Sequence, residues 1–276
     1  MNHTFRFSRL RRLASLITLT SSALLGATAH AHMGIINLTT GIQAGGQSQF
    51  AIAGTTNELQ LNVPHGCNSS HVPSLPAGAA LDTFRFTITV PAALVNSTLR
   101  ATPIALFGVP ARVTNGDGSV TFTYTKTNDP AQADNLVYKP VLRIALPAAA
   151  GTALTKYQFL SVQYCMNGNQ EVAMDWGAAD SPRLLVFPVK RAGFNRYTLD
   201  ALTAPDFAAT GTTTIESRLK SYFGDAAVIW VGKSGYSPNA ETQSKITNLI
   251  GKDSSYSNLA SPGRSLSTAD TLWVRY

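Results

Sequence analysis

Short runs in which apolar and polar residues alternate follow one another from His32 to about residue 189, with Gly, Pro, Asn and Asp between them. The clearest run is 83–90 (TFRFTITV), where every second residue from Phe84 to Val90 is apolar and would share one face of a half-buried strand. The tetrapeptide NGDG at 115–118 is typical of a hairpin turn. Further strands are predicted at 49–52, 58–63, 119–125, 141–146, 157–164 and 184–189. Many short strands joined by turns predict an all-β fold, an immunoglobulin-like β-sandwich.

The pattern changes after about Arg191. Apolar residues at helical spacing and short apolar runs predict two helices, at 212–223 and 241–250, and two strands, at 226–231 and 271–276. The aromatic residues of this region are expected in a core: Tyr222, Trp230, Tyr236 and Trp273. The sequence therefore predicts a small α/β C-terminal appendage, residues 191–276, packed on a sandwich domain of residues 32–190.

The first 31 residues have the three parts of a secretory signal peptide. A basic stretch ends at Arg12, an apolar run of about 15 residues follows, and Ala29-His30-Ala31 forms a small-residue cleavage site. The apolar run is shorter than the roughly 20 residues that span a bilayer. We therefore expect a periplasmic or secreted protein with no membrane anchor after cleavage, whose first residue is His32.

The charge of the chain is concentrated in this leader. The 276 residues carry a formal charge of +7 and are 44% hydrophobic and 13% charged, which fits a folded soluble protein. The leader holds four arginines and no acid, so the rest of the chain has 22 − 4 = 18 basic against 15 acidic residues, or +3. Such a small excess does not indicate nucleic-acid binding.

Cys67 and Cys165 are the two cysteines of the chain, 98 residues apart. Because an exported protein meets an oxidising compartment, we expect them to form a disulfide. Two separate buried thiols are an alternative. A copper site that uses both sulfurs is another, and it would require reduced thiols.

An N-terminal histidine can chelate one metal ion through its α-amine and its ring Nδ1. The α-amine has an ordinary pKa near 7.7 to 8.0, so a metal displaces its proton readily at neutral pH. Cu(II) favours such nitrogen ligands more strongly than the other divalent first-row ions. His32 could therefore be a copper ligand, although signal peptidase also tolerates many residues after its cleavage site.

Four motifs carry a resemblance to a known family. They are Ala31-His32-Met33, Val63-Pro64-His65-Gly66-Cys67, Val162-Gln163-Tyr164-Cys165 and Asp175-Trp176. In order and rough spacing they resemble the YcnI-like family of exported copper-binding proteins, over about residues 31–190. The resemblance implies a β-sandwich that binds Cu(II) through a single-histidine brace, with a carboxylate as a further ligand. On this basis His32 is the chelating ligand and Trp176 lies beside the metal and shields it.

The chain departs from the family at one ligand, because Lys139 stands where the family has a glutamate. A protonated lysine cannot donate a lone pair to a metal. Other residues could complete the site after a local shift: Asp134, Glu171, Asp175 or His71. His71 lies close to Cys67 in the sequence, as does His65, which recurs in the family motif without being a ligand.

Three functions remain open at this stage. The leading hypothesis is copper trafficking or buffering without catalytic turnover, with the copper ion and a membrane or periplasmic copper-handling protein as partners. The first alternative is a copper-dependent oxidative enzyme of the polysaccharide monooxygenase type, with His32 and a second histidine as ligands. The second is a metal-free β-sandwich that binds another protein, with the appendage as its interaction surface.

Overall fold

The computed structural model describes residues 33–39, 48–64, 66–127, 137–149, 151–211 and 213–276. The predicted signal peptide, His32, His65 and Asp134 lie outside the described residues. All described residues belong to one compact unit, Ala31–Tyr276.

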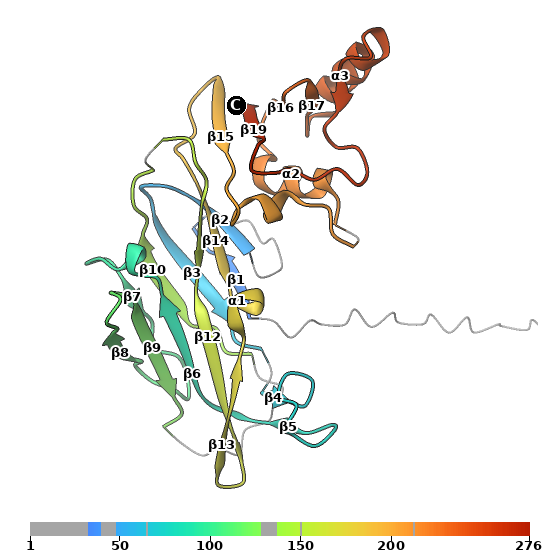
Figure 1. Ribbon diagram of the computed structural model, residues 1–276. Helices are drawn as coiled ribbons and strands as arrows, with labels where there is room; N and C mark the ends of the chain where they lie inside the picture. The colour runs from blue at the N-terminus through green and yellow to red at the C-terminus, as the bar shows by residue number, and fades with distance from the viewer. Residues whose placement is uncertain (1–32, 40–47, 65, 128–136, 150, 212) are drawn as a thin grey trace, which may run out of the picture. The chain divides into compact units, whose positions relative to one another are not determined.

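Two antiparallel sheets form an immunoglobulin-like β-sandwich, as the sequence predicts (Figure 1). The first sheet has the order β1-β3-β10-β7, with β1 at Gly34–Asn37, β3 at Thr56–Asn62, β10 at Val141–Ala145 and β7 at Arg100–Ala101. The second has the order β13-β12-β6-β9-β8, with β13 at Gln170–Asp175, β12 at Leu160–Asn167, β6 at Thr83–Val90, β9 at Val120–Thr125 and β8 at Ala111–Thr114.

Alternation along the strands builds the core between these sheets. In β6, Phe86, Ile88 and Val90 are buried while the threonines between them are partly exposed. They share one apolar cluster with Leu59 and Leu61 of β3. The predicted hairpin is also present, since β8 and β9 pair on either side of the NGDG turn.

A third sheet lies between two cores. Its order is β11-β14-β2, with β11 at Thr155–Gln158, β14 at Arg183–Phe187 and β2 at Ser48–Ile52, and β14 and β2 run parallel. Leu184 and Val186 of β14 pack in the sandwich core, whereas Leu185 and Phe187 pack in the core of the C-terminal region. A strand buried on both faces needs apolar residues in succession, which explains the sequence LLVF. The boundary after residue 190 stays a prediction.

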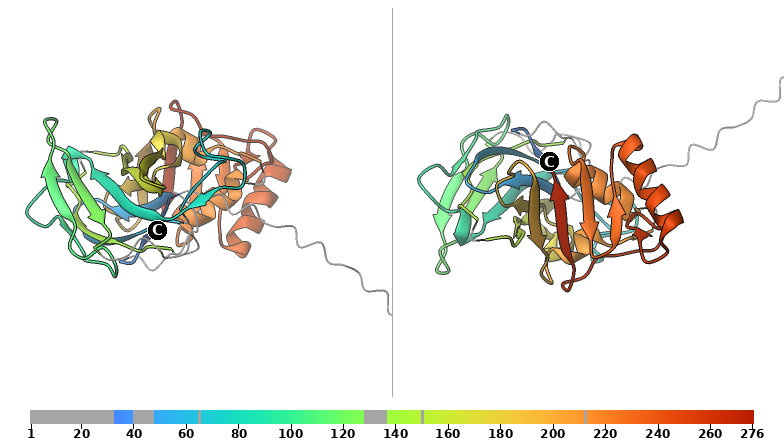
Figure 2. Two further views of the ribbon diagram at one scale, coloured as in Figure 1. Left: turned by 90° about the horizontal axis from the view of Figure 1, so that it is seen from below. Right: turned by 90° about the horizontal axis from the view of Figure 1, so that it is seen from above.

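The C-terminal region is the predicted α/β appendage. Its sheet has the order β15-β19-β16-β17-β18, with β15 at Phe194–Thr198, β19 at Thr271–Arg275, β16 at Val228–Val231, β17 at Ser234–Tyr236 and β18 at Ser257–Asn258. Its helices are α2 (Ile215–Phe223) and α3 (Ala240–Lys252), capped by the side chains of Thr214 and Asn239. Figure 2 shows the last strand, β19, within this sheet. None of the helices in the described ranges combines the length and the apolar character that a membrane span requires.

Two expectations from the sequence are wrong. The run 157–164 is not one strand, because Phe159 separates β11 from β12 and its N–H donates to the carbonyl of Pro182 at 2.9 Å. The break lets the chain leave the third sheet and enter the second. The two tryptophans Trp230 and Trp273 are not in a core, since Trp230 is partly exposed and lies outside the appendage cluster, and 45% of the Trp273 surface is exposed.

The predicted disulfide is present. It joins Cys67 in the short strand β4 (Cys67–Asn68) to Cys165 in β12, with Cα atoms 6.0 Å apart, and both residues are fully buried. β4 pairs with β5 (Ala80–Leu81). A disulfide fits an oxidising, extracellular compartment. It also removes both thiols as metal ligands.

Candidate metal centre

His71 lies in the turn that follows β4. Its backbone N–H is held by the carbonyl and side-chain oxygens of Asn68, at 3.2 and 3.3 Å. Ser70 also donates its N–H to the Asn68 side-chain oxygen, at 3.1 Å. Since β4 is tied to β12 by the disulfide next to Asn68, the imidazole sits on an anchored turn.

The same turn surrounds one ring nitrogen of His71, Nδ1, with polar groups. The Asn68 atom is surrounded by donors, so it is the oxygen of the amide, and it lies 3.0 Å from His71 Nδ1. Because an amide oxygen only accepts, this contact favours the tautomer with the proton on Nδ1 and the lone pair on Nε2; the Ser70 hydroxyl, which can donate or accept, also lies 3.2 Å from Nδ1. A carbonyl behind one ring nitrogen is the usual way in which proteins orient the other toward a metal.

Trp176 packs against this imidazole. The two ring centroids lie 5.2 Å apart with the planes tilted by 52°. Trp176 is buried, and its backbone N–H donates to Ser161 of β12 at 3.2 Å. The indole Nε1 is buried with no acceptor among the described residues. The structure thus brings together the two residues predicted as ligand and shield, although they are far apart in the sequence.

Asp175 is the last residue of β13 and precedes α1 (Gly177–Asp180). Its carboxylate accepts the N–H of Gly177 at 2.8 Å, so one oxygen holds the turn that positions Trp176. The side chain lies at the exposed surface. Asp175 therefore precedes Trp176 in the chain with its carboxylate at the surface, and one of its oxygens already holds the turn.

Glu171 and Lys139 do not extend the site. Glu171 is four residues from Asp175 along β13, which corresponds to about 13 Å in a strand. Its carboxylate pairs with Arg85 of β6 and so is compensated by a cation. Lys139 is exposed in the segment before β10.

The expected chelating residue, His32, lies outside the described residues, as do Asp134 and His65. Met33, the residue after His32, is described and is 1% exposed. It precedes β1 and belongs to the same apolar cluster as Trp176. Within the described ranges, no three histidine, cysteine or acidic side chains form a group that could hold a metal. The described residues therefore offer one oriented imidazole beside a buried indole.

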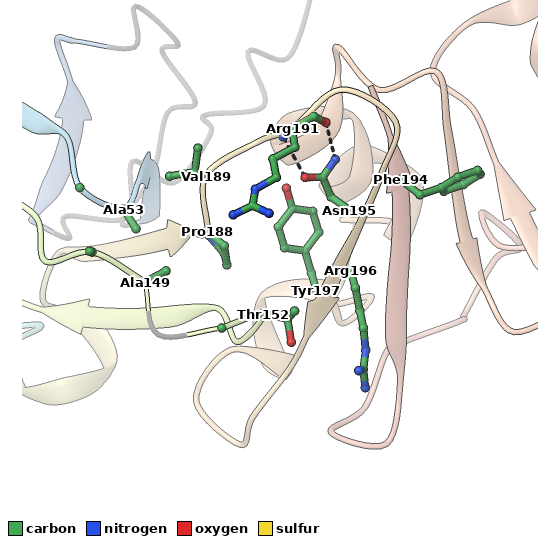
Figure 3. Close-up of a pocket in the computed structure, with 13 residues that line it drawn as sticks. Ala53, Ala149, Thr152, Pro188, Val189, Arg191, Phe194, Asn195, Arg196 and Tyr197 are labelled. Carbon is green, nitrogen blue, oxygen red and sulfur yellow. Dashed lines mark hydrogen bonds between the residues drawn. The ribbon is translucent and has the colours of Figure 1, made fainter.

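A cleft of about 420 Å³ lies elsewhere, where the sandwich meets the appendage. In Figure 3 the Arg191 side chain points into it between Pro188 and Tyr197, while Phe194 and Arg196 extend away from Arg191. Burial raises the pKa of Tyr197, so its hydroxyl stays protonated and can donate. No motif in the sequence points to this cleft, because its walls come from segments that are far apart in the chain: 53–54, 148–149 together with 151–152, and 188–197.

No protein-family profile matches the chain, and no curated protein matches it. Three solved structures show partial similarity. An uncharacterized protein from Nocardia farcinica with an immunoglobulin-like fold is 18% identical, with a TM-score of 0.37, and the match covers 58% of this chain and 99% of that protein. CaCohA2 from Clostridium acetobutylicum is 10% identical, with a TM-score of 0.31 and coverage of 51% and 86%. The collagen-binding subdomain of the Enterococcus faecalis surface protein ACE is 10% identical, with a TM-score of 0.28 and coverage of 51% and 93%. At these scores the comparisons add nothing to the assignment of function.

Proposed function

We propose that the protein is an exported copper-binding protein that chelates Cu(II) through the amine and imidazole of His32, for copper trafficking or buffering. The observation that carries the proposal is the contact between His71 and Trp176 at 5.2 Å. It joins a histidine that the Asn68 side chain holds in a fixed orientation to a buried indole. The sequence predicts both residues at this site.

The burial of Met33 supports the role of His32. Met33, which follows His32 in the chain, is 1% exposed and immediately precedes β1. A chelating residue that is bonded to a buried neighbour loses less conformational entropy on binding than one far along a free tail. In this proposal His32 supplies two nitrogens, His71 a third, and Asp175 or Asp134 an oxygen.

Titration calorimetry of the mature protein with Cu(II) tests the chelate. We expect tight binding when the chain starts at His32 and loss of that binding when one alanine precedes His32, because the amine then no longer belongs to the histidine. Equal affinity of the two forms would overturn the proposal.

Paramagnetic resonance of the cupric complex tests the remaining ligands. His71→Ala should remove one coordinated nitrogen, whereas His65→Ala, the matched control, should leave the count unchanged. Trp176→Phe should keep the affinity and reduce the quenching of tryptophan fluorescence by Cu(II). An unchanged nitrogen count in His71→Ala would remove His71 from the site.

The alternative function, a copper-dependent oxidative enzyme, differs from copper trafficking or buffering in catalytic turnover. A copper enzyme of this kind keeps an open coordination position and forms peroxide when a reductant is supplied. We expect the copper-loaded protein to form no more peroxide than free copper chelated by a histidine-first peptide. Reductant-dependent formation above that level would favour the enzyme.

A further inference from the structure

The outer face of the appendage sheet carries exposed aromatic and cationic side chains. On β16 and β19 the residues Ile229, Val231, Leu272 and Val274 point into the appendage core. Residues of the opposite parity therefore face outward. Arg196, Trp273 and Trp230 lie directly opposite one another on β15, β19 and β16, and Phe194, Arg275 and Val228 form the next row. We call Phe194, Arg196, Trp230, Trp273 and Arg275 the aromatic–arginine face.

The rings of this face form a strip across the strands. Trp230 lies over Gly235 of β17 so closely that a Cβ atom there would come within 2.6 Å of the indole. The Trp230 ring also packs against the Tyr256 ring, with 6.0 Å between the two centroids. Trp273, its neighbour on β19, is 45% exposed and Phe194 is 55% exposed. Exposed aromatic side chains gathered on one face of a sheet are typical of a binding surface.

The charge of the face is positive. The Arg275 guanidinium lies 6.0 Å from the centre of the Phe194 ring, and Lys233 lies 5.7 Å from that of Tyr256. Neither these two cations nor Arg196 forms an ion pair with any other described residue. The outward positions of the five strands hold no carboxylate. The face therefore has unneutralised cations beside flat apolar rings.

The face continues into the cleft described above. Phe194 and Arg196 belong to both, and Arg191 lies inside the cleft without an ion-pair partner in the described part of the chain (Figure 3). The Arg191 guanidinium lies on the side of β15 to which Tyr197 points, so it belongs to the cleft and not to this face. The arrangement suits an extended, flexible polyanion made of ring-shaped units.

We propose that the aromatic–arginine face binds an acidic polysaccharide, in which sugar rings stack on Trp230 and Trp273 and carboxylates pair with Arg196 and Arg275. Aromatic rings offer apolar, polarisable surfaces to the C–H faces of sugars, and the planar guanidinium matches a carboxylate with two parallel hydrogen bonds. The alternative ligand with the same features is a single-stranded nucleic acid. The net charge of only +3 outside the first 31 residues disfavours it, because binding to a phosphate backbone depends on a strong cationic field.

Titration calorimetry of the mature, metal-free protein with alginate oligomers tests the proposal. Alginate is a polymer of uronic acids, cello-oligomers are the neutral control, and oligothymidylate represents nucleic acid. We expect alginate to bind, the interaction to weaken with added salt, and the cello-oligomers to bind at least about tenfold more weakly. A metal chelator is added to every titration, so that copper binding cannot contribute to the result.

Matched variants assign the binding to the face. Trp273→Ala should weaken alginate binding roughly tenfold, as truncation of a central aromatic contact commonly does, and Arg196→Gln should reduce both the affinity and its salt dependence. Leu160→Ala and Arg112→Gln alter exposed residues of the sandwich and should change neither. Circular dichroism should confirm that each variant is folded. Any of three results would overturn the proposal: no alginate binding, equal effects of the face and control variants, or tighter binding of oligothymidylate through the same residues.

Discussion

Gly235 determines where the indole of Trp230 can lie. Its φ is not in the left-handed region, so a side chain is excluded here by the Trp230 ring and not by backbone strain. Gly251 in α3 is a matched contrast, since a Cβ atom added there would meet no atom within 4 Å.

We therefore expect opposite effects of alanine at these two glycines. Gly235→Ala should push the partly exposed indole off β17 and lower the free energy of unfolding by about 1 kcal/mol, as mild overpacking does. Gly251→Ala should raise it by about 0.5 to 1 kcal/mol, because alanine restricts the unfolded chain and favours the helix. Urea unfolding measures both, and a red shift of tryptophan emission reports the movement of Trp230. If Gly235→Ala were stabilised and its tryptophan emission unchanged, the Trp230 ring would not exclude a side chain at position 235.

The exposed position of Trp273 can be predicted from the two-residue alternation of its strand. In 271–275 (TLWVR) Leu272 and Val274 alternate with Thr271, Trp273 and Arg275, so the pattern places the indole with the polar residues. Residue type alone predicts a core position for Trp273, because its side chain is large and apolar. The meeting of His71 with Trp176 had no local signal, because it depends on how a turn after β4 packs against the end of β13.

At the scale of elements, the contact between β11 and the appendage contains a shielded ion pair. Lys156 Nζ lies 2.8 Å from an Asp206 carboxylate oxygen, in a close ion pair rather than an aligned hydrogen bond. The side chains are only 13% and 7% exposed. Lys156 also donates to the carbonyl of Leu202 at 2.9 Å. A single lysine thus connects the third sheet to the segment that contains the 3-10 helix Ala204–Phe207.

Lys156→Met should destabilise the protein by about 3 kcal/mol, because it leaves the Asp206 carboxylate buried without a cation. Asp206→Asn in the same chain should restore part of the loss by removing that charge. Lys245→Met is the control, since its pair with Glu241 on α3 is 71% and 79% exposed and screened by water. Thermal unfolding at fixed pH compares the three variants. Similar melting temperatures for Lys156→Met and Lys245→Met would show that burial does not increase the contribution of the Lys156–Asp206 ion pair to stability.

The third sheet also explains which part of the topology escaped prediction. The alternation in β6 and the NGDG hairpin are local patterns, and both are found as expected. The parallel pairing of β2 with β14 joins residues more than 130 positions apart, and no local pattern encodes it. The break at Phe159 has the same origin, because only the two pairing partners reveal that the chain changes sheets there.

At the scale of the whole molecule, buried tyrosines make stability depend on alkaline pH. Burial raises the pKa of Tyr236 to about 12, with a smaller contribution from Glu216, and burial also raises the pKa values of Tyr124, Tyr222 and Tyr276 above their ordinary range. Tyr124 and Tyr222 lie in the sandwich and appendage cores, respectively. Both cores therefore resist ionisation of their phenols.

The direction of the effect follows from proton linkage. A tyrosine with a raised folded-state pKa holds its proton more tightly in the folded than in the unfolded chain, whose pKa is near 10. Its stabilising contribution is complete below pH 10 and is lost as the pH rises through the folded-state value. We expect the free energy of unfolding to fall as the pH rises from 10 to about 12.

Tyr236→Phe tests the contribution of one residue. The Tyr236 hydroxyl is buried and has no hydrogen-bond partner in the described part of the chain, so its removal should leave the stability at pH 7 unchanged or slightly higher. Above pH 10 the variant should lose up to about 2 kcal/mol less than the natural chain, because phenylalanine does not ionise. Urea unfolding at several pH values, together with the phenolate absorbance of the folded protein, measures both quantities. Parallel losses in the two proteins would mean that Tyr236 ionises in the folded state as readily as in water.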